Sequence, residues 1–153
     1  MIPRVYIDTS VIGGCFDDEF AIWSKLLFGE FQSGIKIAVV SDITRLELEG
    51  APLEVKKILS ILPNTSIENV FLTEEAINLA HSYIGEAISP KHIADAQHIA
   101  IASVERVDIL VSWNFQQIVN IEHIHAFNSV NLKLGYPILE IRSPKEVIYA
   151  EKI

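Results

Sequence analysis

Short apolar runs alternate along the chain with longer segments in which apolar residues recur at helical spacing. The runs are rich in β-branched residues and predict strands near residues 4–7, 36–40, 67–72, 109–112 and 138–141. Strands that alternate with helices are typical of a mostly parallel sheet with helices on both faces. The pattern therefore predicts an α/β fold, a three-layer α/β/α sandwich around a mostly parallel central sheet.

The segments between the strands carry helix start and stop signals. The stretch DDEFAIWSKLLFGEFQSG predicts a helix that Gly34 stops. Thr73, followed by two glutamates, predicts a helix that runs to about Ala87, and Ser89 with Pro90 predicts the start of the next one. ITRLELEGAPLEVKKILSIL predicts two helical pieces, because a Gly-Ala-Pro sequence interrupts it, and the final SPKEVIYAEKI predicts a short helical tail.

Length and composition predict one compact domain over residues 1–153. Half of the 153 residues are hydrophobic and 21% are charged, a balance typical of globular proteins. The longest apolar runs fall far short of the roughly 20 residues that a membrane helix needs. The N-terminus has no secretory signal and Cys15 has no cysteine partner, so we expect a cytoplasmic protein with no membrane span.

The net charge of −8, from 20 acidic and 12 basic residues, opposes long-range attraction of a nucleic acid. This disfavours a simple nucleic-acid-binding module. It is compatible with an enzyme that holds divalent cations between its own carboxylates and a phosphate. Candidates for phosphate contacts are Arg45, Lys56, Lys57 and Lys91, although single basic residues on helices are usually solvated surface groups.

Polar residues gather where strands of the predicted sheet end, which is where sites form in open parallel sheets. These residues are Asp8, Asp42, Glu47, Ser112 and Asn114, with Asp95 in the first turns of the helix before the fourth strand. Hard cations such as Mg²⁺ and Mn²⁺ prefer oxygen ligands, and carboxylates from separate elements leave room for water and a phosphate. If the sheet is parallel, these side chains could converge into such a site.

Each acid also has a purely structural interpretation. Asp8, in VYIDTSVI, could cap a helix that begins at residue 10 or 11. Glu47 could be an exposed helix acid that the pattern hardly distinguishes from Glu49. Asp95 could be an acid favoured by the dipole near a helix start, although its neighbours in HIADAQHIAIA are mostly apolar.

Other common site chemistries lack their motifs. His92 and His98 are six residues apart, so the i,i+4 pair of a helical zinc site is absent. Ser10 has no G-x-S-x-G context, and there is no P-loop or dinucleotide-binding fingerprint. A phosphoacceptor receiver domain also uses acids at strand ends, but its motifs would follow a different order.

Four motifs together resemble the PIN domain, the metal-dependent nuclease fold of VapC-type toxins. They are VYIDTSVIGG, the Glu-Leu pair in SDITRLELEG, DAQHIAIA and LVSWNFQQIVN, while NLKLGYPILEIRSPKEV resembles the C-terminal end of one bacterial and archaeal PIN branch. The resemblance covers nearly the whole chain and rests on the order and spacing of the motifs. It implies a PIN-like fold, a Mg²⁺ or Mn²⁺ cofactor and cleavage of RNA by an activated water.

The resemblance also implies roles for particular residues. Asp8, Glu47 and Asp95 match the first, second and third acids of the family's metal site, so that Asp8 is a metal ligand rather than a cap. Asn114 stands where many members place a fourth acid, and Thr9 or Ser10 matches the hydroxyl that often follows the first acid. Because Asn114 is neutral, we expect a weaker second metal position, with its amide oxygen still available as a ligand.

The family further implies a homodimer that an antitoxin protein neutralises. Our leading hypothesis is therefore a toxin ribonuclease, and the alternative is a PIN-like module that binds RNA or protein with weak or no catalysis. Trp23, Leu27 and Phe31 in AIWSKLLFGEF are interpreted as core residues, the alternative being a dimer or antitoxin surface.

Overall fold

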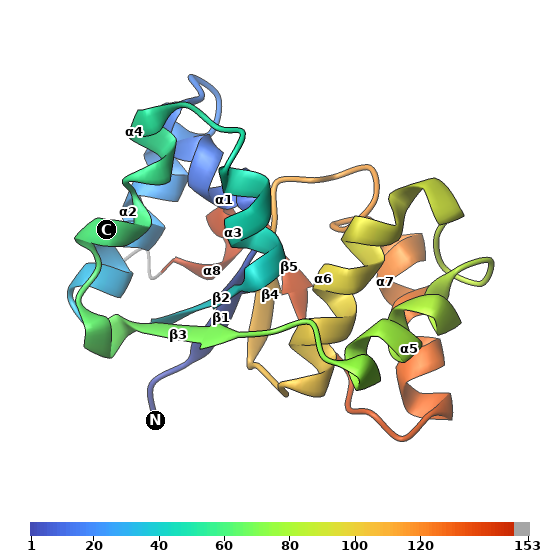
Figure 1. The fold of residues 1–153 in the computed structure, drawn as a ribbon. Helices are drawn as coiled ribbons and strands as arrows, with labels where there is room; N and C mark the ends of the chain where they lie inside the picture. Colours follow the sequence, from blue (N-terminus) through green and yellow to red (C-terminus); the bar gives the residue numbers. More distant parts are fainter. Residues whose placement is uncertain (149–153) are drawn as a thin grey trace.

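In the computed structural model, residues 1–148 are described and form a layered α/β fold around one parallel sheet (Figure 1). The strand order is β3-β2-β1-β4-β5, and every neighbouring pair is parallel. The strands are β1 (Arg4–Ile7), β2 (Ile37–Ser41), β3 (Ile67–Val70), β4 (Ile109–Val111) and β5 (Ile141–Arg142). The predicted three-layer sandwich is confirmed.

Helices cover both faces of the sheet. Figure 1 shows α5, α6 and α7 on one side of the strands and α1 to α4 with α8 on the other. The helices are α1 (Thr9–Gly13), α2 (Ala21–Gln32), α3 (Asp42–Leu48), α4 (Leu53–Lys56), α5 (Glu74–Tyr83), α6 (Ile93–Val104), α7 (Ile121–Lys133) and α8 (Pro144–Val147). Short 3-10 turns are η1 (Gly14–Phe16), η2 (Leu59–Ile61), η3 (Asn64–Ser66) and η4 (Pro90–His92).

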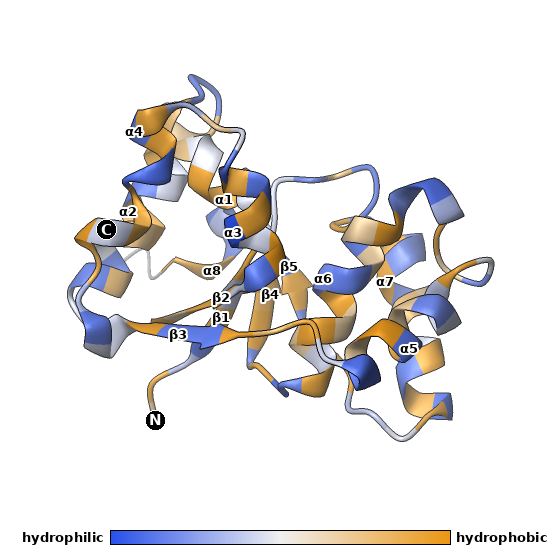
Figure 2. Cartoon of the chain, in the orientation of Figure 1, coloured by the Kyte–Doolittle hydropathy of each residue, from blue (hydrophilic) through white to orange (hydrophobic). Residues whose placement is uncertain are grey.

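The two-residue period of the strands divides the core between the two faces. Tyr6 and Val39 pack among α5, α6 and α7, whereas Val5, Ile7 and Val40 pack against α1 and α2. The central strands β1 and β2 are buried on both sides, which explains why their sequences are mostly apolar (Figure 2). No helix among the described residues is long and apolar enough to cross a membrane.

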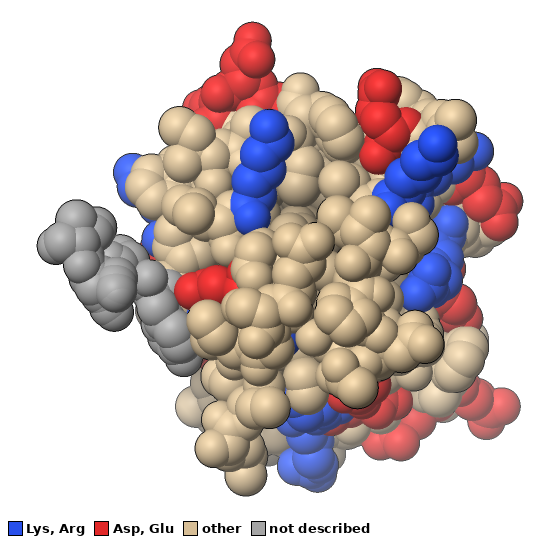
Figure 3. All heavy atoms as spheres, turned by 90° about the vertical axis from the view of Figure 1, so that its left-hand side faces the viewer, with Lys and Arg blue, Asp and Glu red and all other residues tan. Residues whose placement is uncertain are grey.

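Several predicted elements are confirmed. Gly34, at φ +80°, follows α2, and the Thr73 hydroxyl accepts a hydrogen bond from Ala76 N at the start of α5. Leu27 and Phe31 are fully buried core residues, while Trp23 is half-buried and lies beneath Lys145 Nζ. Figure 3 shows this side of the molecule, where uncharged residues occupy most of the middle of the face.

Other boundaries were predicted wrongly. The last strand lies at residues 141–142 rather than 138–141, because the Asn128 side chain bonds both Leu139 N and Leu139 O. Helix α5 ends at Tyr83, before Gly85 at φ +88°. Helix α7 was not predicted, and only α8 of the predicted C-terminal tail falls within the described residues.

The strand order also tests whether the chain is a phosphoacceptor receiver domain. Receiver domains have the order 2-1-3-4-5, in which the first strand lies next to the third. Here β1 lies between β2 and β4, and β3 is at the edge. The topology therefore differs from that of a receiver domain.

Candidate functional site

The candidate acids lie where the sheet ends at its carboxyl edge. Asp8 directly follows β1, and Asn114 follows β4, which pairs with β1 in parallel. Glu47 is on α3 and Asp95 is the third residue of α6. Hydrogen bonds between these segments bring the side chains toward one region of the molecule.

Asp8 is a buried carboxylate held by three hydrogen bonds. Its Oδ1 accepts from Ser10 Oγ at 2.6 Å and from Val11 N at 3.3 Å, and its Oδ2 accepts from Ser112 Oγ at 2.6 Å. It therefore caps α1, as the cap interpretation had it, although the helix begins at Thr9 rather than at residue 10 or 11. Burial raises the pKa of the Asp8 carboxyl, although the hydrogen bonds and His98 oppose this shift.

Glu47 is more exposed, and side chains from two other elements, Thr9 and His98, hold it. Its Oε1 accepts from Thr9 Oγ1 at 2.5 Å and lies 3.1 Å from His98 Nε2. Burial tends to raise the pKa of Glu47, but the hydrogen bonds from His98 and Thr9 outweigh it, so the pKa is lowered. Glu47 is thus favoured as an anion.

His98 is a site residue that sequence reasoning missed. Its side chain is only 2% exposed, and its Nδ1 lies 2.6 Å from the Tyr6 hydroxyl, which donates to Ser41 Oγ at 2.7 Å. The signal for its position was present, because residues three apart on a helix share a face, and His98 is three residues after Asp95.

Asp95 lies within electrostatic reach of the other two acids. Burial raises its pKa, the charges of Asp8 and Glu47 raise it further, and His98 and His92 lower it. Its carboxylate makes only a long contact of 3.5 Å with Asn114 Nδ2 and one of 3.7 Å with His92 Nδ1. The charges of two acids that are distant in sequence therefore act on Asp95 in the fold.

Asn114 is oriented differently from our expectation. Its Oδ1 accepts from Gln116 N at 3.2 Å and from Gln117 N at 2.9 Å. These two donors fix the amide orientation, so its NH₂ group, rather than its oxygen, faces Asp95. Asn114 is therefore a turn residue that adjoins the acids and does not offer them an oxygen ligand.

Other predicted polar residues lie elsewhere. Asp42 Oδ1 accepts from Leu72 N, next to β3, and Arg45 donates to Asn69 Oδ1 at 2.7 Å. Arg45 lines a separate hollow with Glu49 and Lys56. Lys57 and Lys91 are exposed, and their role in phosphate binding stays a prediction.

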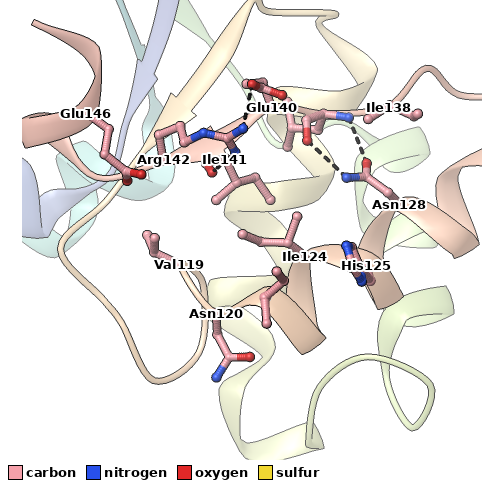
Figure 4. Close-up of a pocket in the computed structure, with 12 residues that line it drawn as sticks. Val119, Asn120, Ile124, His125, Asn128, Ile138, Glu140, Ile141, Arg142 and Glu146 are labelled. Carbon is pink, nitrogen blue, oxygen red and sulfur yellow. Dashed lines mark hydrogen bonds and ion pairs between the residues drawn. The ribbon is translucent and has the colours of Figure 1, made fainter.

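A hollow of about 500 Å³ beside edge strand β5 contains none of the candidate acids (Figure 4). It lies between α7 and the segment that contains β5. Arg142 pairs with Glu140 at 2.8 Å and donates to Ile141 O, while Asn128 bonds the backbone of Leu139. These side chains form hydrogen bonds with backbone groups along the free edge of β5 and next to it. The bonds protect that edge from pairing with another strand.

The donor chemistry of the acids fits a hard divalent cation. Within residues 1–148, no three Cys, His, Asp or Glu side chains are gathered tightly enough to form a ready-made metal cage. Mg²⁺ usually keeps several waters and takes only one or two carboxylates, so it does not require such a cage. The charges of Asp8 and Glu47 raise the pKa of Asp95, and a bound cation would offset this concentration of negative charge.

Comparison with known proteins supports the fold. No protein-family model matches the chain, and no curated protein sequence matches it. The sarcin-ricin loop cleaving toxin VapC20 of Mycobacterium tuberculosis superposes with a TM-score of 0.56 and 13% identity, covering 73% of this chain and 91% of that one.

Two further solved structures are similar. VapBC2 of Rickettsia felis, bound to a DNA fragment from its promoter, matches with a TM-score of 0.59 and 12% identity over 92% of this chain and 98% of that one. FitAcB of Neisseria gonorrhoeae matches with a TM-score of 0.55 and 15% identity over 94% of this chain and 99% of that one. At these identities the likeness shows the fold, which is that of VapC-like PIN domains.

Proposed function

We propose, from the PIN-domain fold and the converging acids, that this protein is a Mg²⁺- or Mn²⁺-dependent endoribonuclease and the toxin of a toxin–antitoxin pair. One observation carries the proposal. Asp8, Glu47 and Asp95 come from separate elements, yet the charges of the first two raise the pKa of the third. Acids gathered in this way at the carboxyl edge of a parallel sheet suit the binding of a cation and a phosphate.

The three carboxylates would hold the metal. When bound, Mg²⁺ or Mn²⁺ would lower the pKa of a water molecule and offset the charge that develops on a phosphodiester. Asp8 and Glu47 are the better-positioned ligands, because hydrogen bonds fix their carboxylates. Asp95 has weaker contacts, which leaves its carboxylate freer to adjust.

Hydrogen-bonding side chains around the acids set their orientation. Ser10 and Ser112 each donate to a different oxygen of Asp8, so its carboxylate cannot turn without losing a bond. Thr9 and His98 both contact Oε1 of Glu47 and hold that oxygen in place. The chain thus fixes negative charge at defined positions, the preorganisation that hydrolysis of a phosphodiester requires.

An antitoxin protein is proposed as the partner. Two of the structural neighbours, VapBC2 and FitAcB, are toxin–antitoxin complexes. A homodimer, an RNA substrate and a cytoplasmic location belong to the same proposal. The low identities mean that the RNA target of VapC20 is not carried over to this chain.

The proposal is tested by incubating the purified protein with a panel of structured and single-stranded RNAs in Mn²⁺, in Mg²⁺ and in EDTA. We expect cleavage with either metal and none in EDTA. Asp8→Asn and Asp95→Asn should abolish it, whereas Glu49→Gln, a change of an exposed acid outside the site, should not. Cleavage that persists in EDTA or in both Asp variants would contradict the proposal.

A binding module without catalysis is the second candidate. It is favoured by Asn114, which is neutral and turns its amide oxygen toward Gln116 and Gln117. In that case the same panel would show RNA that is retained by the protein but uncut with every metal. Cleavage that requires metal and Asp95 would exclude this candidate.

A further inference from the structure

Three aromatic side chains form a cluster beside the acids, which we call the aromatic platform: Phe20, Trp113 and Phe115. Phe20 and Trp113 are stacked with ring centroids 4.1 Å apart and an interplanar angle of 14°. Phe115 lies 6.1 Å from Trp113 and 6.4 Å from Phe20, with its ring tilted against both. The members come from the residues before α2 and the loop after β4.

The platform adjoins the acids through the chain and through hydrogen bonds. Asn114, between Trp113 and Phe115 in sequence, is the residue whose NH₂ group contacts Asp95. Ser10 accepts a hydrogen bond from Trp113 N at 2.9 Å and donates to Asp8. The platform is therefore joined to Asp8 through Ser10 and to Asp95 through Asn114.

The platform has a fixed base and an exposed outer ring. Trp113 is only 8% exposed, its Nε1 donates to Ser24 Oγ at 2.9 Å, and it packs against Gly14. Phe115 is 49% exposed, so much of its ring faces solvent. The core does not need this exposed ring surface, since Phe20 and Trp113 already cover each other.

The charge of the protein makes such a surface useful for RNA. At a net charge of −8, electrostatic attraction cannot supply most of the affinity for a polyanion. Stacking of a base on an aromatic ring does not depend on net charge and suits unpaired bases of any sequence. A base held there would lie next to the phosphate at the acids.

We propose that the aromatic platform binds an unpaired base of the RNA, with Phe115 as the stacking ring and Phe20 and Trp113 as its support. The proposal rests on the nuclease function proposed above, and it identifies single-stranded or looped RNA as the substrate class. Phe115 is here a substrate-binding residue, whereas Trp113 positions it.

The test measures binding separately from cleavage. Fluorescence anisotropy would compare a labelled oligoadenylate with an abasic ribose-phosphate oligomer of equal length, which carries the same charge without bases. Every protein would carry Asp95→Asn so that the RNA stays intact. The platform variants are Phe115→Leu, which keeps an apolar side chain, and Phe115→Tyr, which keeps the ring; Phe71→Ala, another exposed phenylalanine next to β3, is the control.

We expect Phe115→Leu to weaken oligoadenylate binding roughly tenfold, the effect of losing one base–ring stack. Phe115→Tyr and Phe71→Ala should bind as the parent does, and the abasic oligomer should bind all four proteins equally weakly. The dependence of affinity on salt should not change, because no phosphate contact is lost.

Unchanged oligoadenylate binding by Phe115→Leu would overturn the proposal, as would equal binding of the abasic oligomer by the parent. If Phe115→Leu instead lost only its ability to bind a partner protein, the platform would be a protein-docking surface and the proposal would be wrong. Cleavage by the protein with native Asp95 is measured in parallel. Absence of cleavage would refute the nuclease function, while the binding comparison would still decide the role of Phe115.

Discussion

A hydrogen-bonded chain of side chains leads from the core of the molecule to the candidate site. Ser41, Tyr6, His98 and Glu47 are linked in that order, and the first three are buried. Buried polar groups are costly when they lose a partner, so each member constrains the next. The orientation of a carboxylate at the surface is thereby coupled to packing around the sheet.

Removing the Tyr6 hydroxyl tests this coupling. Tyr6→Phe removes the hydroxyl that contacts both Ser41 Oγ and His98 Nδ1, so each loses one buried partner while Ser41 keeps Thr44 and His98 keeps Glu47. The variant should lower the free energy of unfolding by about 1–3 kcal/mol. Tyr136→Phe is the matched control, because its hydroxyl bonds Glu75 at the surface, and it should change stability by less than about 1 kcal/mol. Urea denaturation would measure both. Equal stability of the two variants would show that the buried chain is not important for folding.

The acids should also make the metal-free protein sensitive to pH. The pKa values of Asp8 and Asp95 are raised in the folded state, so the folded chain binds these protons more tightly than the unfolded chain. Stability should therefore fall as the pH rises from about 4, near the unfolded Asp pKa, through the raised values. Glu47, whose pKa is lowered, acts in the opposite sense, and its stabilisation is lost at lower pH.

Asp95→Asn should remove part of this pH dependence. In EDTA at pH 7 the variant should melt at a higher temperature than the wild type, because it removes a charge that burial and two neighbouring acids disfavour. Thermal melts from pH 4 to 8 would show a shallower fall for the variant. A variant that melts at a lower temperature at neutral pH would mean that Asp95 stabilises the metal-free fold.

At the scale of elements, a close approach between two segments shapes the region around the site. A Cβ built on Gly14, in η1, would lie 2.6 Å from Ser24 Oγ and 2.7 Å from Trp113 Nε1. Gly13, at the end of α1, has no atom within 4 Å of such a Cβ. The two adjacent glycines of VYIDTSVIGG therefore have different roles, and only Gly14 is required for packing.

Alanine substitutions distinguish the two glycines. Gly14→Ala forces Trp113 or Ser24 to move and should cost about 1–3 kcal/mol of stability. Gly13→Ala should be neutral or stabilise by up to about 1 kcal/mol, because alanine favours the helix. Chemical denaturation of both variants checks this. A Gly14→Ala protein as stable as Gly13→Ala would show that the indole is not closely packed there.

The elements that sequence predicted best are those with strong local signals. Strands β1 and β2 are buried on both faces and are continuous apolar runs, and α5 has a capping threonine. Helix α1 is only five residues long and strand β5 only two, so neither has a clear pattern. Short elements that depend on contacts distant in sequence cannot be read from periodicity.

The candidate site could also be predicted only in part from the sequence. The positions of Asp8, Glu47 and Asp95 follow from strand ends and motif order, and helical spacing places His98 on the same face as Asp95. The contact of His98 with Glu47 and the orientation of Asn114 do not follow from the sequence. Both depend on hydrogen bonds between side chains and backbone that form only in the folded chain. Such contacts leave no separate pattern in a single sequence.

At the scale of the whole molecule, acidic charge and function are connected. A parallel sheet places the ends of β1 and β4 together, and the flanking helices bring Glu47 and Asp95 toward Asp8. If the protein acts on RNA as proposed, its net charge of −8 makes a bound cation most useful at the place where the RNA would bind. The central claim is that these three acids together hold that cation.

Calorimetric titration with Mn²⁺ tests this claim most directly. We expect the wild type to bind Mn²⁺, and Asp95→Asn and Glu47→Gln to bind it at least about tenfold more weakly. Loss of a residue that supports a metal ligand already weakens metal affinity about tenfold or more, and loss of the ligand itself should weaken it at least as much. Glu49→Gln, which changes the neighbouring acid, should bind as the wild type does. If the wild type shows no binding at millimolar Mn²⁺, or if Glu49→Gln weakens it as much as Asp95→Asn, the acids do not form a metal site.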